Sequence, residues 1–295
     1  MSLQPFISLY RYALEPIAPF SWFGIKVCSI ELVAALRFCT ILRQIREDLY
    51  AKYQRRTGDK PASVEEKSFL RDLCTSLTIK FGGEAIIGPL LGVPPSFVLS
   101  GVSPCVYIAA QAIVEYIPVI PSMSLSTELP LSIVDGFTRA LLLCSFIPKP
   151  VITHASPDIA SSPWTLLLSS FVIANGGFFI MDMVTFLKPT PLTLHMSQPA
   201  ERPIKPYGWA ATEFCCAPSI TGLYALLTHA QPFWAELHSV ISTALGTTGD
   251  KVVPMDPEAA RALCALILTG MSSIRAVKNY RLVLKRDATE KIKLQ

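Results

Sequence analysis

The chain has 295 residues and a formal net charge of +4. It is 51% hydrophobic and only 16% charged, with a mean hydropathy of +0.43, whereas soluble domains carry about 25% charged residues. These values exclude an ordinary soluble domain and predict a membrane protein, and no nucleic-acid partner is expected.

Seven stretches of the chain are long and apolar enough to cross a membrane. A hydrocarbon core about 30 Å thick requires about 20 apolar helical residues. Many of the 24 prolines fall between these stretches, where helices are expected to end. The predicted fold is therefore an all-α polytopic membrane protein with seven transmembrane helices, at 17–42, 66–99, 102–121, 129–150, 163–187, 207–229 and 257–280.

The distribution of basic residues predicts the orientation of these helices. Most Lys and Arg residues outside the spans fall in 43–67, in 188–206 and after residue 274. Cytoplasmic loops carry such an excess. We therefore expect a lumenal N-terminus at 1–16 and a basic cytosolic tail at 281–295. The mixed-charge segment 43–67 is expected to be a solvated helical extension.

The segment 79–92 reads IKFGGEAIIGPLLG and combines two features that membrane helices disfavour. Gly82 and Gly83 each cost about 1 kcal/mol in a helix relative to alanine. Lys80 and Glu84 carry charges that cost roughly 2.5–3.5 kcal/mol at the bilayer centre.

A second glycine pair recurs in a later span. Gly176 and Gly177 lie 94 residues after the first pair, and Asp182 follows them. Each pair belongs to a group of three spans, so the second group enters the membrane in the opposite direction. This arrangement is an inverted repeat, in which interrupted helices mark the transport site. The predicted parts are a first repeat at 17–128, a second at 129–229, and a lumenal loop with the seventh helix at 230–280.

Two interpretations of these residues remain open. The glycines either kink both helices and line a pore, or they allow close helix packing. Lys80 and Glu84 either neutralise each other on one helix face or act, with Asp182, as pore charges. The pore interpretation predicts modest selectivity among monovalent cations.

No pattern in the chain predicts catalysis or metal binding. The eight cysteines show no C-x-x-C spacing, and the four histidines are scattered. Nucleophile-elbow, Walker and dinucleotide-binding glycine patterns are absent from the sequence. We therefore predict a protein that is not an enzyme and that has no cofactor and no metal.

Several blocks of the sequence resemble the trimeric intracellular cation channels of the endoplasmic and sarcoplasmic reticulum. The blocks are FGGEAIIGPLLGVPPSFVLSG, VDGFTRALLLCSFIP, SPWTLLLSSFVIANGGFFIMDMVTFLKP and LHMSQPAERPIKPYG, between about residues 66 and 230. The resemblance implies seven helices, a homotrimer with one pore per subunit, and passive K⁺ and Na⁺ flow that balances Ca²⁺ movement. It also implies that Gly82, Gly83, Gly176 and Gly177 line the pore.

The chain departs from this family at one motif. Animal members carry a K-E-V-x-R segment that binds a phosphoinositide, and this chain has no such string. Arg139 and Lys149 are its only candidate lipid-binding residues in that region. Phosphoinositide binding therefore stays open.

The last residues, KIKLQ, suggest a location. Lys291 and Lys293 match the K-x-K-x-x retrieval pattern of endoplasmic-reticulum membrane proteins, which is read by a receptor on a cytosolic C-terminus. We expect an endoplasmic-reticulum or nuclear membrane protein. The alternative function is a secondary transporter of a small solute or lipid built on the same repeat, and a third is a non-conducting scaffold.

Overall fold

The computed structural model describes residues 3–17, 27–57, 68–120, 124–184, 209–246 and 252–293, without the side chains of 52, 54–57, 209–214, 279 and 281–293. The described residues form helices, and one isolated β-bridge joins Pro16 to Cys28. The helices are α1 Gln4–Leu14, α2 Ser29–Thr57, α3 Phe69–Leu90, α4 Ser96–Leu99, α5 Val102–Tyr116, α6 Leu125–Leu141, α7 Pro148–Ile152, α8 Pro157–Ser161, α9 Pro163–Met183, α10 Trp209–Thr228, α11 Pro232–Ala244 and α12 Pro257–Lys293.

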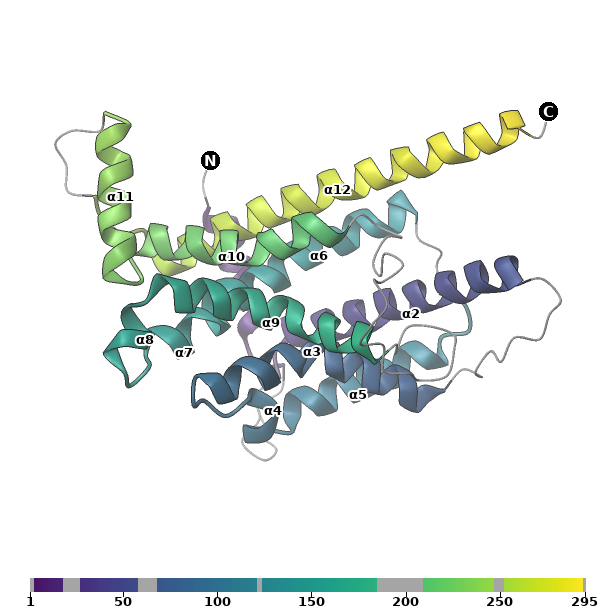
Figure 1. Ribbon diagram of the computed structural model, residues 1–295, viewed down its shortest axis with the longest axis horizontal. Helices are drawn as coiled ribbons and strands as arrows, with labels where there is room; N and C mark the ends of the chain where they lie inside the picture. The colour runs from purple at the N-terminus through teal and green to yellow at the C-terminus, as the bar shows by residue number, and fades with distance from the viewer. Residues whose placement is uncertain are drawn as a thin grey trace.

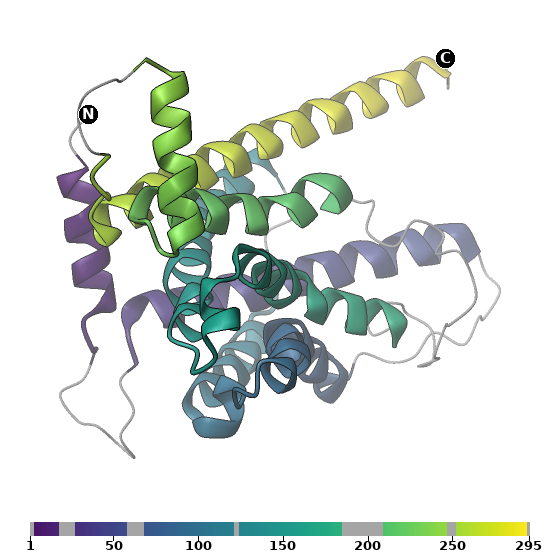
Figure 2. The ribbon, with the colours of Figure 1, turned by 60° about the vertical axis from the view of Figure 1, so that its left-hand side comes forward.

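The long helices run side by side along the longest axis of the molecule (Figure 1). α6 packs mainly against α12, α3 against α9, and α2 against α5. Figure 2 shows α1 and α11 at one end of this bundle, standing across the direction of the long helices. The all-helical prediction is confirmed for the described residues.

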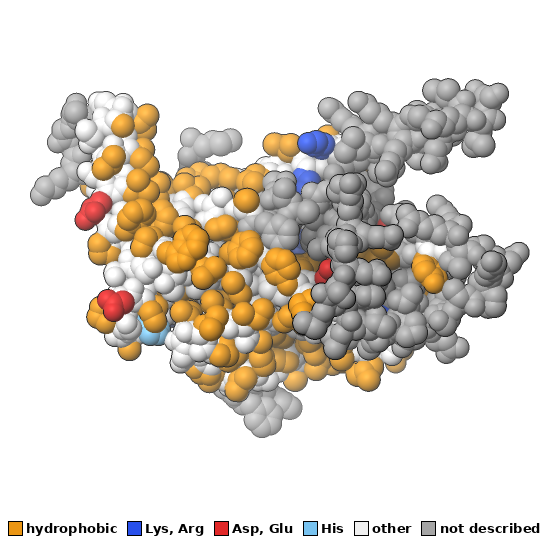
Figure 3. All heavy atoms as spheres, viewed as in Figure 1, with side chains coloured by type: hydrophobic (Ala, Val, Ile, Leu, Met, Phe, Trp, Pro, Cys, Tyr) orange, Lys and Arg blue, Asp and Glu red, His pale blue; other side chains and the backbone are white. Residues whose placement is uncertain are grey.

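Three described segments are long and apolar enough to cross a membrane, namely Leu125–Ile152, Pro163–Met183 and Pro257–Lys278. They correspond to the predicted spans at 129–150, 163–187 and 257–280. Hydrophobic side chains also cover much of the surface over α9 and α10 (Figure 3), and exposed large ones on α9 include Leu168 and Phe179. An apolar surface of this kind suits contact with lipid.

The remaining predicted spans differ from the observed helices at their ends. α2 begins at Ser29 rather than at residue 17 and continues to Thr57, and residues 18–26 lie outside the described residues. The predicted span 66–99 breaks after Leu90, because the chain turns at Gly92, whose φ of +64° is left-handed, and then passes two prolines. α5 ends at Tyr116, so it is shorter than the predicted 102–121.

The two ends of the chain also carry more helix than predicted. α1 occupies most of the N-terminal segment 1–16, for which only a lumenal location was predicted, and packs on α12 and α2. Tyr10 is buried there and its hydroxyl donates to the carbonyl of Phe137 at 2.7 Å. At the other end α12 continues to Lys293 through the predicted tail.

α6 leads into a short π-helical segment, Leu142–Phe146, which ends two residues before Pro148. Proline lacks an amide hydrogen and its ring crowds the preceding turn, so the helix must adjust there. The carbonyl of Leu143 is satisfied by the hydroxyl of Thr221 on α10 at 3.1 Å. The π-helical segment therefore lies inside the bundle, and its Leu143 carbonyl is hydrogen-bonded there.

Candidate permeation site

The two glycine pairs meet where α3 and α9 cross. All four glycines are buried. A Cβ atom added to Gly83 would lie 2.4 Å from the carbonyl oxygen of Ile173, and one added to Gly177 would lie 2.2 Å from that of Ile79. No side chain fits at either position, so the glycines allow the two helix backbones to touch.

Both helices continue through these glycines without an interruption. α3 is helical from Phe69 to Leu90 and α9 from Pro163 to Met183. The reason is that glycine removes the Cβ that would hold the helices apart, while the helical hydrogen bonds of each backbone persist. The packing interpretation therefore describes the glycines in this structure, and they do not line the cavity described below.

The contacts at the crossing come in matched pairs. Every residue of one contact lies 94 residues from its counterpart in the matching contact. The matched contacts are Gly83 with Ile173 and Gly177 with Ile79, and Gly82 with Ile180 and Gly176 with Ile86. α3 and α9 run in opposite directions in Figure 1. A local two-fold axis therefore relates α3 to α9 at the crossing.

One hydrogen-bonding serine on each helix follows the same offset. Ser76 on α3 donates to the side-chain oxygen of Gln111 on α5 at 2.7 Å. Ser170 on α9 lies 2.8 Å from the hydroxyl of Thr221 on α10. Both serines are fully buried and lie 94 residues apart. Each glycine-bearing helix is therefore tied to the next long helix along the chain in the same way.

Lys80 extends into a small cavity beside the crossing, where a few polar side chains lie among mostly apolar ones. The cavity measures about 80 Å³ and lies between α2, α3, α5 and the end of α6, with Glu31, Ser103, Tyr107 and Thr138 among its lining residues. The Lys80 ammonium lies 5.6 Å from the ring centroid of Tyr107, within reach of a cation–π attraction. The volume is sufficient for several water molecules.

The other two predicted pore charges are not among the residues that line this cavity. The Glu84 carboxylate accepts hydrogen bonds from the amide and hydroxyl of Ser96 at 3.0 and 2.5 Å, at the start of α4. Asp182 lies in the last turn of α9, and its neighbour Met181 packs with Ile79 of α3. Because the helices run in opposite directions, Glu84 and Asp182 lie on opposite sides of the crossing.

The two candidate lipid-binding residues are also separated. Arg139 lies 3.3 Å from the buried carboxylate of Asp135, which is also bound by Arg37 of α2 at 2.7 Å. Lys149 is exposed in α7. Ten residues of helix correspond to roughly 15 Å of rise. The structure therefore does not gather Arg139 and Lys149 into one basic site.

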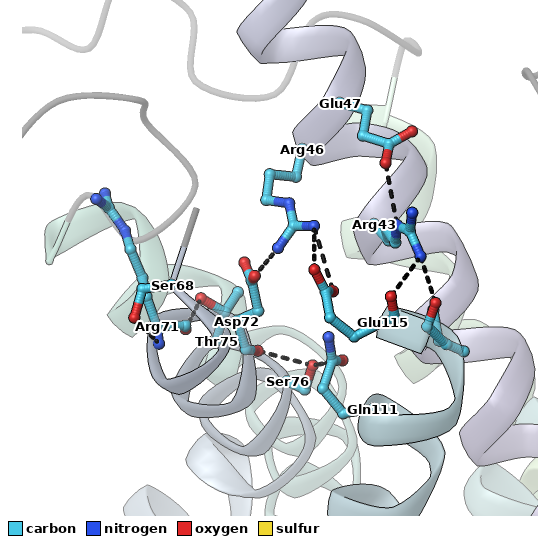
Figure 4. Close-up of polar contacts among 11 residues, drawn as sticks. Arg43, Arg46, Glu47, Ser68, Arg71, Asp72, Thr75, Ser76, Gln111 and Glu115 are labelled. Carbon is cyan, nitrogen blue, oxygen red and sulfur yellow. Dashed lines mark hydrogen bonds and ion pairs between the residues drawn. The ribbon is translucent and has the colours of Figure 1, made fainter. Parts of the chain in front are cut away.

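A buried ion cluster joins α2, α3 and α5, and the sequence interpretation missed it (Figure 4). Arg46 forms ion pairs with Asp72 and with Glu115, the latter at 3.3 Å. Arg43 donates to backbone carbonyls at the end of α5, including that of Ile117 at 2.8 Å. Both arginines are buried, so this part of 43–67 is not the solvated extension predicted. Their spacing, one helical turn, was the available signal.

Other predicted features lie outside the described residues. They include the block LHMSQPAERPIKPYG and the side chains of Lys291 and Lys293. Groups of three or more His, Cys, Asp or Glu side chains arranged for a metal ion are absent from the described part of the chain.

Comparisons with protein-family models, with curated proteins and with solved structures gave no match for this chain. The resemblance to the intracellular cation channels therefore stays a prediction.

Proposed function

We propose that this chain crosses an intracellular membrane with seven helices and conducts monovalent cations. The seven would be α2, α3, α5, α6 with its continuation to Ile152, α9, α10 and α12. The apolar segments of α6, α9 and α12 support this count, as does the shorter apolar segment Cys215–Thr228 of α10. α2 and α3 carry more charge, but Arg46, Asp72 and Arg37 are paired with partners on other helices, as charges in a membrane protein must be.

The matched contacts at the glycine crossing are the observation that carries the proposal. They support two repeats of three helices, α2–α3–α5 and α6–α9–α10, related by a two-fold axis in the membrane plane. Inverted repeats of this kind form the transport site of many membrane proteins at the repeat interface. α12 would then be the added seventh helix.

The cavity at Lys80 is the part of this interface best suited to ions. Hydroxyl groups and Glu31 provide oxygen atoms, while the Lys80 ammonium would reduce cation occupancy. Lys80 rather than the glycines is therefore the proposed pore residue, and the glycines set the distance between the repeats. Glu84 and Asp182 would add negative charge on opposite sides of the crossing.

The permeant ions would be K⁺ and Na⁺, in a current that balances Ca²⁺ release or uptake. The basic segments 43–57 and 275–293 lie on one side of the proposed spans and support a cytosolic C-terminus and a lumenal N-terminus. Lys291 and Lys293 support the endoplasmic-reticulum or nuclear membrane. A homotrimer is proposed from the family resemblance alone.

Purified full-length chain in planar bilayers tests the proposal. We expect unitary currents carried by K⁺ and Na⁺, and a larger cation conductance in Lys80→Met, because the repelling charge is removed. Lys80→Arg should conduct like the parent. Lys149→Met is the matched control, since Lys149 is exposed in α7 and is not among the residues that line the cavity.

Two other outcomes would reject conduction. Saturable solute or lipid exchange without unitary events would favour a secondary transporter, which the same repeat could serve. Absence of both activities from correctly folded protein would favour a scaffold.

A further inference from the structure

α11 has an orientation unlike that of the proposed spanning helices. It stands upright in Figure 1, where α6, α9, α10 and α12 run across the view. It is still upright in Figure 2, after a rotation about the vertical axis. α11 therefore stands across the general direction of those helices in both views, so a membrane that they cross would have α11 along its surface.

Hydrogen bonds fix the start of α11 at one end of α9. The side-chain amide of Gln231 donates to the carbonyl of Ala160 at 2.7 Å and to that of Ser162 at 3.2 Å. Ser162 is the N-cap of α9. The Trp234 indole donates to Gln231 at 3.0 Å, and its ring packs with Leu166 in a buried cluster. α11 thus begins at the level of the first turn of α9.

A second aromatic residue marks this level. Trp164, in the first turn of α9, is 69% exposed. Tryptophan is enriched where membrane helices meet the headgroup region. The first turn of α9 and the start of α11 therefore lie where the membrane surface is expected.

α11 is amphipathic, and only part of its apolar face is covered by the bundle. Trp234 and Leu237 pack in the buried cluster with Leu166. Further along this face Ile241 is exposed, and Val240, at the edge of the face one turn after Glu236, is 64% exposed. Figure 3 shows hydrophobic side chains along the side of α11 that faces the length of the bundle, and an acidic side chain on the other side. The uncovered apolar surface is thus directed toward the proposed membrane interior.

We propose that α11 is an interfacial anchor whose uncovered apolar face lies in the phospholipid of the leaflet at this end. Amphipathic helices parallel to a membrane bind in this way, through buried apolar area and through attraction of basic residues to anionic lipid. α11 contains no Lys or Arg and one Glu. Its binding would therefore depend on apolar burial and not on anionic lipid. The inference rests on the proposed spanning helices but not on ion conduction.

Photocrosslinking in the full-length chain tests the anchor. Benzoylphenylalanine replaces Val240 in one variant and exposed Ser239, on the polar face, in the matched control. Both are reconstituted in phosphatidylcholine vesicles that contain an alkyne-tagged phosphatidylcholine. We expect several-fold more chain–lipid adduct from position 240 than from 239, with no increase when phosphatidylserine is added.

Each alternative result overturns part or all of the proposal. A chain–chain adduct at position 240 would show that another copy covers this face. Equal lipid adducts at both positions, or none at either, would remove the anchor. A yield at 240 that requires phosphatidylserine would reject binding by apolar burial. The assay needs no current, so it can succeed or fail separately from the proposed channel activity.

Discussion

Replacing Gly83 with alanine adds one methyl group at the point where α3 and α9 touch. That Cβ would lie 2.4 Å from the carbonyl oxygen of Ile173, 2.5 Å from its Cα and 2.6 Å from the carbonyl oxygen of Val172. All three are backbone atoms, so no rotamer change relieves the contact. Since ordinary contacts begin at 3.4 Å, the helices must separate by about 1 Å.

The expected loss of stability in Gly83→Ala follows from two opposing effects. Overpacking of a close-packed contact costs about 1–3 kcal/mol, whereas alanine is favoured over glycine in a helix by about 1 kcal/mol. Gly270→Ala supplies the second effect alone, because a Cβ on Gly270 of α12 meets nothing within 4 Å. We therefore expect Gly83→Ala to be less stable than Gly270→Ala by about 1–3 kcal/mol.

Thermal unfolding of the purified variants in one detergent, followed by intrinsic fluorescence, measures this difference. Gly177→Ala should behave like Gly83→Ala, because its contacts are the matching ones. The double variant should lose less stability than the two single variants added together. The reason is that helices already separated by the first methyl group accommodate the second. Equal melting temperatures for Gly83→Ala and Gly270→Ala would refute the crossing described here.

Two further predictions concern charged residues. Arg46→Met leaves Asp72 and Glu115 without their buried partner and should cost about 3–5 kcal/mol in thermal unfolding. Arg11→Met breaks a pair in which the arginine side chain is 68% exposed, and should leave stability nearly unchanged; a similar loss in both variants would contradict the buried cluster. Changing Lys291 and Lys293 to serine should release tagged protein to later compartments, as seen by fluorescence microscopy, and an unchanged location would show that the motif is incidental.

Composition and hydropathy predicted the helical membrane class because they need only sums over long segments. The same sums located the helices α6, α9 and α12 to within a few residues at their N-terminal ends. They did not locate the end of α3, which depends on the local backbone at Gly92. They also misplaced α2, because buried arginines such as Arg46 count as polar in any hydropathy sum, whatever their partners.

The role of the glycine pairs could not be decided from sequence. A Gly-Gly pair lowers helix propensity and also permits close packing, and these effects predict opposite structures. The outcome depends on which helix lies opposite. In the structure the opposite helix carries the other pair, and each pair accommodates the backbone of the other. The recurrence of the Gly-Gly pair was therefore informative, because it indicated that the two helices pack against each other.

In this bundle, packing residues repeat at the 94-residue offset, whereas the charged residues Lys80 and Glu84 do not. Residues repeated at the 94-residue offset include Ser76 with Ser170, Ile79 with Ile173 and both glycine pairs, and all of them make helix contacts. Lys80, by contrast, corresponds to Ala174, and Glu84 to Phe178. Contacts across a two-fold axis constrain both copies together, whereas a charge is needed on only one side of a shared path. The proposed conduction uses positions where the repeat fails, and Lys80, which lines the cavity, comes first among them.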